Sequence, residues 1–507
     1  MGRKFLAVFF ILTLQLSSTP VKAAERVKAT NWEDQSIYYL MIDRFNDGDP
    51  KNNQEVDSID SLAYHGGDFQ GIIDKLDFLK DMGFTAISLS SIFKNTDRGY
   101  HGNWIVDYYK INEHFGTMTT FQKLVKEAHS RNLKVIIDFN ANNVAREHPW
   151  VADPNKQNWF HPEQSNPVQP ENSWVSGMPD LNQDNPEVKS YLMDAAKWWI
   201  KKTDIDGYRL NEANDVPISF WRDFAKAVKS EKSSIFLLGD VSAQQLEDLK
   251  KHQNAGFDGF VNNPASTELR KDFAAPDQAL AKLFADWEKL RKNVKNPYLM
   301  GNYFDDPSTV RFTSDMVAAK QFPGARWKIA LTYLFTAPGI PIVYYGSEIA
   351  LNGGKVPDNQ RQMNFRAETE LIDYITKLGK LRNQYRSLSR GAMKLLYEKN
   401  GMVIYKRVYN GETAVIAINN TSQSQTAAVS SSLLADGKEL RGLLDGDLIQ
   451  SKNQQYSFIL DRDKAEIYVL ADKSGINIPL IAAIALVYIA FTIFIIIIIR
   501  KRKNKIN

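Results

Sequence analysis

Apolar positions between residues 36 and 345 alternate between two patterns. One is helical, with apolar residues three or four apart, as at Ile72, Ile73, Leu76 and Leu79 within 69–82. The other is a short run rich in β-branched and aromatic residues. The strands predicted from these runs are 36–42, 85–90, 134–138, 207–210, 235–239, 257–261, 298–302 and 341–345. Strands interleaved with helices in this number predict a (β/α)8 TIM barrel, with its active site at the C-terminal strand ends.

Two departures from this alternation divide the chain. Segment 141–180, after the third strand, is rich in Asn, Pro and Trp and lacks helical periodicity, so we expect a small inserted domain there. Beyond residue 388 the pattern changes to strands and turns, which predicts a C-terminal β-sandwich domain over 389–472. The barrel is then built from 24–140 and 181–388.

The two ends predict where the protein resides. Residues 1–23 combine basic Arg3 and Lys4, an apolar core and a Val21-x-Ala23 cleavage pattern, as in a secretory signal peptide. Segment 479–499 has no charged residue and is long enough to cross a bilayer. The basic tail 500–507 would remain cytoplasmic. We therefore expect a secreted protein anchored in the cell membrane by a C-terminal transmembrane helix, with the barrel extracellular.

Composition removes several functions from consideration. The chain has no cysteine, which excludes disulfides and thiol chemistry. Its formal net charge is +4, and part of that charge lies in the basic tail, so no nucleic-acid surface is expected. Aromatic residues make up 11% of the chain, which suits a carbohydrate-binding protein as well as a large core.

Six short motifs together resemble those of the α-amylase family of glycoside hydrolases (family 13), in its order and spacing. They occupy residues 43–53, 64–68, 99–104, 178–182, 206–215 and 339–348. The resemblance covers nearly everything between the signal peptide and the membrane segment. It implies the predicted barrel and an α-1,4-linked glucan as the substrate class.

The resemblance also implies three catalytic carboxylates, and this chain differs at each position. Asn211 replaces the nucleophilic aspartate, and an amide cannot ionise to attack a sugar. Asp240 replaces the acid glutamate and is one methylene shorter. Phe304 replaces the third carboxylate, with Asp305 and Asp306 displaced along the chain. The candidate catalytic positions are Asn211, Asp240 and Asp305.

The sugar-binding positions implied by the resemblance are partly kept. Tyr100, His101, Trp104 and Arg209 match and are the candidate substrate-binding residues. Structural roles in the barrel would also explain their presence. The other positions carry different residues, namely Asn103, Asn143, Val356 and Gln360.

A calcium-binding loop keeps the pattern of the family. The candidate ligands are Asp47, Asp49, Asn52, Asn53 and Asp68. Short side chains with hard oxygen atoms at such spacing suit Ca²⁺. An Asx-rich turn without metal is the alternative. A second, weaker site would use Asn142 and Asp215.

Two functions remain open. The favoured one is a weak or inactive amylase homologue, a pseudoenzyme that binds α-glucan (starch or maltooligosaccharide) or a protein partner. The alternative is an active α-1,4-glucan hydrolase that uses Asp240 as the acid and a relocated carboxylate to activate water, by an inverting route. Side-chain alternation along a strand predicts that Glu212 points away from the lumen, which favours the loop residues Asp305 and Asp306 for that role.

Overall fold

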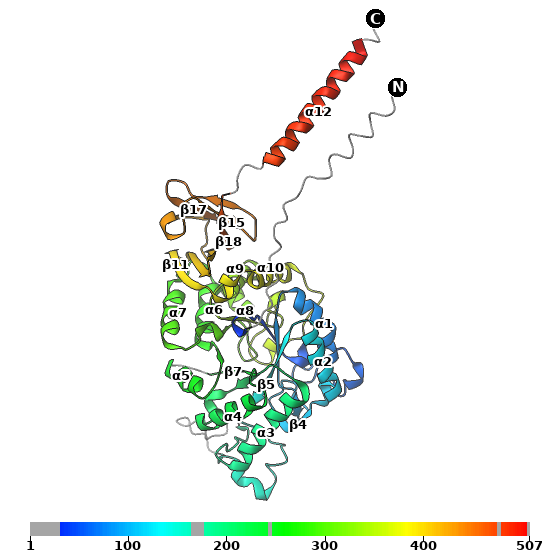
Figure 1. Ribbon diagram of the computed structural model, residues 1–507. Helices are drawn as coiled ribbons and strands as arrows, with labels where there is room; N and C mark the ends of the chain where they lie inside the picture. The colour runs from blue at the N-terminus through cyan, green and yellow to red at the C-terminus, as the bar shows by residue number, and fades with distance from the viewer. Residues whose placement is uncertain (1–30, 164–176, 242–245, 474–477, 504–507) are drawn as a thin grey trace.

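The computed structural model describes residues 31–163, 177–241, 246–473 and 478–503. Its centre is a closed barrel of parallel strands in the order β1, β2, β5, β6, β7, β8, β9, β10, which confirms the predicted TIM barrel (Figure 1). The strands are β1 Ile37–Leu40, β2 Ala86–Leu89, β5 Lys134–Asn140, β6 Gly207–Asn211, β7 Phe236–Gly239, β8 Gly259–Val261, β9 Met300–Asn302 and β10 Ile340–Tyr344. Nearly all of their residues are buried, because helices cover the barrel outside.

The helices begin where the sequence offers a cap. Asp68, Thr117 and Asn185 accept hydrogen bonds from the first turns of α1, α2 and α3 with their side chains. The helices around the barrel are α1 Phe69–Asp81, α2 Met118–Ser130, α3 Pro186–Thr203, α4 Ile218–Glu231, α5 Leu246–Asn254, α6 Asn263–Ala274, α7 Ala281–Asn293, α8 Phe312–Ala318, α9 Pro323–Thr336, α10 Glu370–Gln384 and α11 Arg386–Arg390.

The segment between β5 and α3 is largely irregular where it is described. It contains a 3-10 helix, Pro154–Trp159, and isolated bridges that pair Asn143 with Asp180 and Phe160 with Leu181. The indole of Trp159 donates to Glu187 on α3 (3.0 Å), which ties the segment to the barrel. A short antiparallel pair, β3 Phe93–Asn95 and β4 Ile105–Ile111, lies in the preceding connection. That 141–180 forms a domain of its own stays a prediction.

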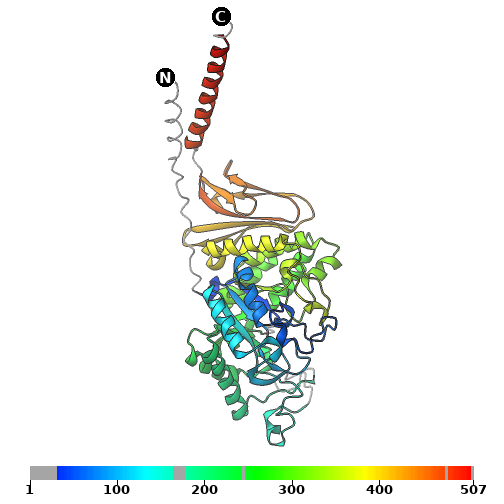
Figure 2. The ribbon, with the colours of Figure 1, turned by 90° about the vertical axis from the view of Figure 1, so that its right-hand side faces the viewer.

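The C-terminal region is all β, as predicted. One sheet has the order β11, β12, β13, β18, β15, β16, and a second pairs β14 with β17. Both contribute to one apolar core, which includes Ile404, Val415 and Phe458. The strands are β11 Ala392–Lys399, β12 Met402–Tyr409, β13 Glu412–Asn419, β14 Gln425–Ser430, β15 Lys438–Gly442, β16 Leu448–Gln450, β17 Gln455–Leu460 and β18 Lys464–Asp472. Figure 2 shows these strands stacked on α9 and α10.

A long apolar helix, α12 (Ile478–Lys503), extends away from the folded body (Figures 1 and 2). Its segment Ala482–Arg502 has a mean hydropathy of 3.0, with none of it buried, and has the length and composition of a membrane span. The predicted signal peptide 1–23 lies outside the described residues, as does the end of the basic tail.

A buried carboxyl joins the first and last barrel strands. Tyr38 on β1 donates its hydroxyl hydrogen to Glu348, which follows β10 (2.5 Å), and both side chains are fully buried. Burial raises the pKa of Glu348 from 4.5 to about 7. The closure of the barrel therefore includes a carboxyl that titrates near neutral pH.

We expect Glu348→Gln to gain stability over the unmodified protein as the pH rises. A carboxyl with a higher pKa in the folded chain contributes most stability below its unfolded pKa, and that contribution is lost as the pH rises through the folded value. From about pH 5 to about pH 8, the free energy of unfolding of the variant should therefore rise by about 2 kcal/mol relative to the unmodified protein. Urea unfolding followed by fluorescence measures it, since all 10 tryptophans lie within residues 32–327.

The matched control is Glu231→Gln, at the exposed end of α4. A difference between Glu348→Gln and the unmodified protein that stays constant over this pH range would contradict the prediction.

Candidate active site

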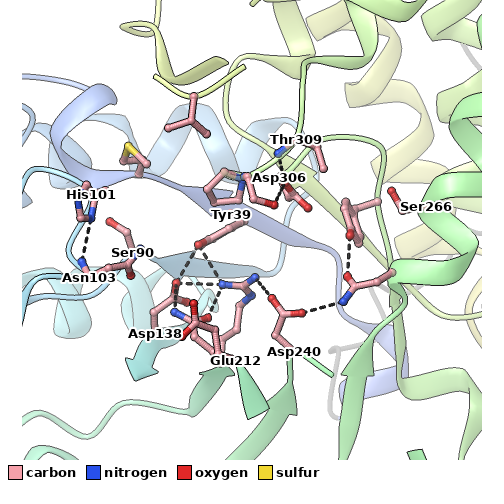
Figure 3. Close-up of a pocket in the computed structure, with 18 of the residues that line it drawn as sticks. Tyr39, Ser90, His101, Asn103, Asp138, Glu212, Asp240, Ser266, Asp306 and Thr309 are labelled. Atoms are coloured by element: carbon pink, nitrogen blue, oxygen red, sulfur yellow. Dashed lines mark hydrogen bonds and ion pairs between the residues drawn. The ribbon is translucent and has the colours of Figure 1, made fainter. Parts of the chain in front are cut away.

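The C-terminal ends of the barrel strands open into a cavity of about 1060 Å³ (Figure 3). Tyr39 on β1, Asp138 on β5, Arg209 on β6 and Asp240 after β7 form its floor. Parallel strands end on one side of the barrel, and for this reason side chains distant in sequence meet here.

Arg209 is the centre of the cavity floor. Its Nη1 donates to Asp138 Oδ2 (3.1 Å) and to the Tyr39 hydroxyl (3.1 Å), and its Nη2 donates to Asp240 Oδ2 (2.5 Å). Tyr39 in turn donates to Asp138 (2.8 Å). Burial alone would lower the pKa of Arg209, but Tyr39 and the two carboxylates raise it well above its ordinary value. The guanidinium is a permanent cation held by two aspartates (Figure 3).

Asn211 is fixed by the same cluster. Its Oδ1 accepts a hydrogen bond from Arg209 (2.6 Å), and its Nδ2 donates to Asp138 Oδ2 (3.2 Å). Both ends of the amide are thus engaged. Asn211 lines the cavity at the position predicted for the nucleophile, but it supplies no carboxylate.

Asp240 also lines the cavity, and both of its oxygens are occupied. Oδ2 is ion-paired with Arg209, and Oδ1 accepts a hydrogen bond from Asn263 Nδ2 (2.9 Å). Asn263 accepts one from the Tyr303 hydroxyl (2.6 Å). An acid that protonates a leaving group must first carry a proton. The ion pair with Arg209 instead favours the ionised carboxylate.

The end of β9 is filled with aromatic rings where the resemblance implies a carboxylate. Phe304 is buried and stacks on Phe312 with ring centroids 4.7 Å apart. Asp305, the predicted third catalytic position, is buried beside it and does not line the main cavity. Asp305 accepts from the backbone of Phe312 (2.6 Å) and from the Ser347 hydroxyl (2.8 Å). Asp306 lies at the cavity wall instead.

The expectation that Glu212 points away from the lumen is wrong, because Glu212 lines the cavity. Strand β6 ends at Asn211, and Glu212 adopts a left-handed conformation (φ 51°, ψ 40°), which breaks the alternation of side chains. Its carboxylate accepts from the side-chain amide of Asn143 (3.2 Å). Desolvation, and then the nearby Asp215 carboxylate, raise the pKa of Glu212. Periodicity cannot detect a turn that begins immediately after a strand.

The structure separates the four candidate substrate-binding residues. Arg209, His101 and Trp104 line the cavity, and 37% of Trp104 is exposed, which leaves ring surface for a sugar. Burial lowers the pKa of His101 to about 4, so this ring is neutral near pH 7. Tyr100 is enclosed and does not line the cavity. It donates to Gln360 (2.8 Å) and lies under the guanidinium of Arg44.

Sequence comparison missed other polar groups that line the cavity. They include Tyr39, Asn263, Ser266, Thr267, Tyr303 and Thr309. Asn263, Ser266 and Thr267 come from α6, where no motif guided the prediction, and Tyr303 and Thr309 come from the loop after β9.

The predicted calcium loop is held together largely by Asp68. The carboxylate of Asp68 caps α1 through Gly71 N (2.6 Å) and accepts from Asp49 N (2.8 Å) and Asn52 Nδ2 (3.1 Å). Asn53 Nδ2 donates to Asp47 Oδ2 (2.6 Å). The Oδ1 atoms of Asn52 and Asn53 are buried and accept no hydrogen bond within the described residues. Buried oxygens without a donor beside two carboxylates fit a Ca²⁺ site.

The second candidate calcium site gathers oxygen atoms around Asn142. The side-chain amide of Asn142 lies against the Asp180 carboxylate (3.1 Å) and the backbone oxygen of Asp215 (2.7 Å). With the amide turned so that its nitrogen faces them, Asn142 donates to both oxygens, and the site then needs no metal. Its chemistry is therefore less distinctive than that of the first loop.

Comparison with known proteins places the chain among proteins that act on α-glucans. Residues 39–387 match the family profile described as "Alpha amylase, catalytic domain", and residues 391–468 match "Alpha-amylase C-terminal domain". The chain is 32% identical to a cyclomaltodextrinase of Geobacillus thermopakistaniensis, covering 83% of this chain and 74% of the relative. It is also 32% identical to a beta/alpha-amylase of Paenibacillus polymyxa, covering 87% of this chain but 38% of that longer protein.

Two solved structures are more similar. An Anoxybacillus alpha-amylase is 53% identical, with a TM-score of 0.86 over 88% of this chain and 100% of its own. An alpha-amylase from Geobacillus thermoleovorans, solved in complex with acarbose, is 50% identical, with a TM-score of 0.84 over the same shares.

We expect Asp240→Asn to lower the free energy of unfolding by about 1–3 kcal/mol, because it leaves the buried Arg209 with a single carboxylate partner. Urea unfolding followed by tryptophan fluorescence measures the loss. The matched control is Asp223→Asn, which breaks an ion pair with Lys189 at the surface and should cost under about 1 kcal/mol. An effect of Asp240→Asn no larger than that of the control would contradict the structural role of the Arg209–Asp240 pair.

Proposed function

Because this chain belongs to the α-amylase family, we propose that its cavity binds an α-glucan and hydrolyses it weakly or not at all. The observation that carries the proposal is the ion pair between Arg209 and Asp240. In this ion pair the Asp240 carboxylate, at the acid position, neutralises the buried Arg209 cation.

Glycoside hydrolysis needs one group to protonate the leaving oxygen and a carboxylate to attack the sugar or activate water. In this cavity Asn211 replaces the nucleophile with a hydrogen-bonded amide. Asp240 is ion-paired with Arg209 and hydrogen-bonded to Asn263, and Phe304 packs into the aromatic core at the third position. Groups that act together in a transition state are strongly non-additive, so a set altered at every member retains little rate enhancement.

Binding of an α-glucan does not require the catalytic carboxylates. Its size, about 1060 Å³, suits a chain of several sugar units. The exposed ring of Trp104 offers a stacking surface, and hydroxyl and amide groups such as Ser266, Thr267 and Asn263 offer hydrogen bonds to sugar hydroxyls. The acarbose complex of the Geobacillus thermoleovorans relative supports an oligosaccharide-like ligand for the family fold. A protein partner is the alternative ligand.

A second candidate function is an α-1,4-glucan hydrolase with relocated carboxylates. The observation that favours it is Glu212, which faces the cavity with a raised pKa and so suits a proton donor. Asp306 on the opposite loop, or Asp240 once freed from Arg209, would activate water in an inverting reaction. Release of reducing sugar from α-glucan by the unmodified chain, and its loss in Glu212→Gln, would identify this function.

We also propose that Ca²⁺ occupies the loop of Asp47, Asp49, Asn52, Asn53 and Asp68. Asp47, Asp49 and the two unpaired amide oxygens would supply ligands, while Asp68 positions the loop through its hydrogen bonds. The ion would stabilise the loop between β1 and α1.

The proposed location follows from the apolar helix α12 and the predicted signal peptide. Export of the N-terminus and a membrane span at residues 482–502 would place the barrel outside the cell, tethered to the lipid bilayer. An α-glucan captured there would be held at the cell surface.

We expect the purified full chain to bind maltoheptaose without releasing reducing sugar above background. Trp104→Ala should weaken binding about tenfold, or about 1.4 kcal/mol, in calorimetric titration.

Asn211→Asp alone should leave starch hydrolysis near background, because Asp240 stays short and Phe304 stays in place. Two outcomes would overturn the proposal of an inactive protein. One is turnover typical of the relatives in the unmodified chain that is lost in Asp240→Ala. The other is such turnover in Asn211→Asp alone.

We expect a calcium chelator to lower the melting temperature of the full chain, since an ion that binds only the folded state must stabilise it. Asp49→Ala should reproduce most of that decrease and remove the sensitivity to chelator. Asp74→Ala, on the exposed face of α1, is the matched control and should retain the sensitivity. Equal chelator sensitivity in Asp49→Ala and the control would exclude this loop as the calcium site.

We expect protease added to intact cells to release the barrel. A fragment lacking α12 should appear in the medium while a cytoplasmic marker protein stays intact. Protection of the barrel until the cells are lysed would contradict the proposed topology.

A further inference from the structure

The C-terminal sheets are connected to α12 by a short segment. Strand β18 ends at Asp472 and α12 begins at Ile478, with only residues 473–477 between them. Because an extended chain spans at most about 3.6 Å per residue, the end of β18 lies within about 22 Å of the start of α12. In both views the C-terminal strands lie between the barrel and α12 (Figures 1 and 2). With α12 in a bilayer, this end of the sheets is therefore held close to the lipid headgroups.

Several segments of the C-terminal region meet at the end of β18. Its last residue, Asp472, lies opposite Lys438, the first residue of β15, and the two side chains form an ion pair (2.5 Å). The turn between β12 and β13 lies at the same end, since the pairing of these strands closes at Tyr409 and Glu412. Residues 431–437, which connect the end of β14 to β15, return to this end as well. Their 3-10 helix Ser431–Leu433 exposes 37% of Leu433.

One face of the larger sheet is only partly covered toward this end. Ile404, Lys406 and Val408 lie on the same face of β12, because side chains alternate along a strand. Ile404 is fully buried in the core shared with the second sheet, whereas Lys406 and Val408 are half-buried. The second sheet thus covers the middle of this face and leaves its end accessible.

Two lysines oppose each other on this face. Lys394 on β11 lies directly opposite Lys406 on β12, and like charges in such a pair repel. Burial, and then the charge of Lys394, lower the pKa of Lys406. The Nζ of Lys406 donates to the backbone oxygen of Leu433 (2.5 Å), and within the described residues neither lysine forms an ion pair with a carboxylate. An anionic group brought to this face would relieve the repulsion.

Positive charge predominates at this end of the sheets. The acidic side chains here are Glu412, Asp436 and Asp472, and each already has a hydrogen-bond or ion-pair partner. The basic side chains are Lys394, Lys406, Lys438, Lys452 and Lys473. Lysines next to a membrane span are attracted by anionic lipid headgroups.

We propose that this end of the C-terminal sheets docks on anionic phospholipid headgroups of the bilayer that holds α12. Lys394 and Lys406 contact the phosphates, and Leu433 and Val408 reach the boundary between headgroups and acyl chains. The inference rests on the proposed membrane span and is independent of α-glucan binding. Docking would fix the orientation of the barrel at the membrane surface.

Fluorescence quenching by lipid tests the docking. The chain has no cysteine, so Ser432→Cys, exposed beside Leu433, carries a single fluorescent label in the full chain reconstituted into lipid nanodiscs. A nitroxide attached to lipid headgroups should quench the label strongly in discs containing phosphatidylglycerol and weakly in discs of phosphatidylcholine alone. Equal quenching in the two kinds of disc, or none in either, would overturn the proposal. A chain that enters neither kind of disc would contradict the proposed membrane span and, with it, this inference.

Charge variants locate the contact. Lys394→Gln combined with Lys406→Gln should lower the ratio of docked to undocked chains in the anionic discs about thirtyfold. Lys201→Gln combined with Lys202→Gln, at the exposed end of α3, removes the same charge elsewhere and should leave the quenching unchanged. Should the first double variant fail to fold, Lys394→Gln alone decides, with a decrease of about fivefold. Unchanged quenching in a folded variant of these two lysines would overturn the proposal.

Discussion

The cavity floor is organised around one buried cation. The guanidinium of Arg209 cannot lose its proton, so the folded chain must surround it with negative charge and acceptors. Asp138, Asp240, Tyr39 and the carbonyl oxygen of Asn211 meet that need. Asn211 meets the guanidinium with an amide oxygen, and Asp240 reaches Arg209 from the end of β7. Asp240 therefore acts as a counter-ion of Arg209.

Hydrogen bonds connect the end of β9 to this buried cation. The Tyr303 hydroxyl donates a hydrogen bond to Asn263, and Asn263 donates one to Asp240, the partner of Arg209. Phe304 next to Tyr303 turns into the aromatic cluster with Phe312 and Trp327. Asp305 lies within ion-pair distance of Arg311 (3.7 Å) and Arg270 (3.6 Å) inside the protein. The carboxylates of this region stabilise the fold, and the cavity keeps Asp306 and Glu212 at its walls.

Helix α6 forms one wall of the main cavity, where it contributes the polar side chains of Asn263, Ser266 and Thr267. The residues of the predicted calcium loop and of the C-terminal sheets do not line this cavity.

The sequence by itself determined the barrel, the all-β C-terminal region and the apolar helix α12, because each rests on the period and length of apolar runs. It also placed Asn211, Asp240, Trp104 and Arg209 at one site, since motifs at strand ends converge in any such barrel. Only the tertiary structure decided how those groups are used. The ion pair of Asp240, the enclosure of Tyr100 and Asp305, and the left-handed turn that brings Glu212 into the cavity depend on contacts between distant segments. Periodicity records which residues are buried, whereas the direction of a side chain at a strand end depends on the partner that it meets there.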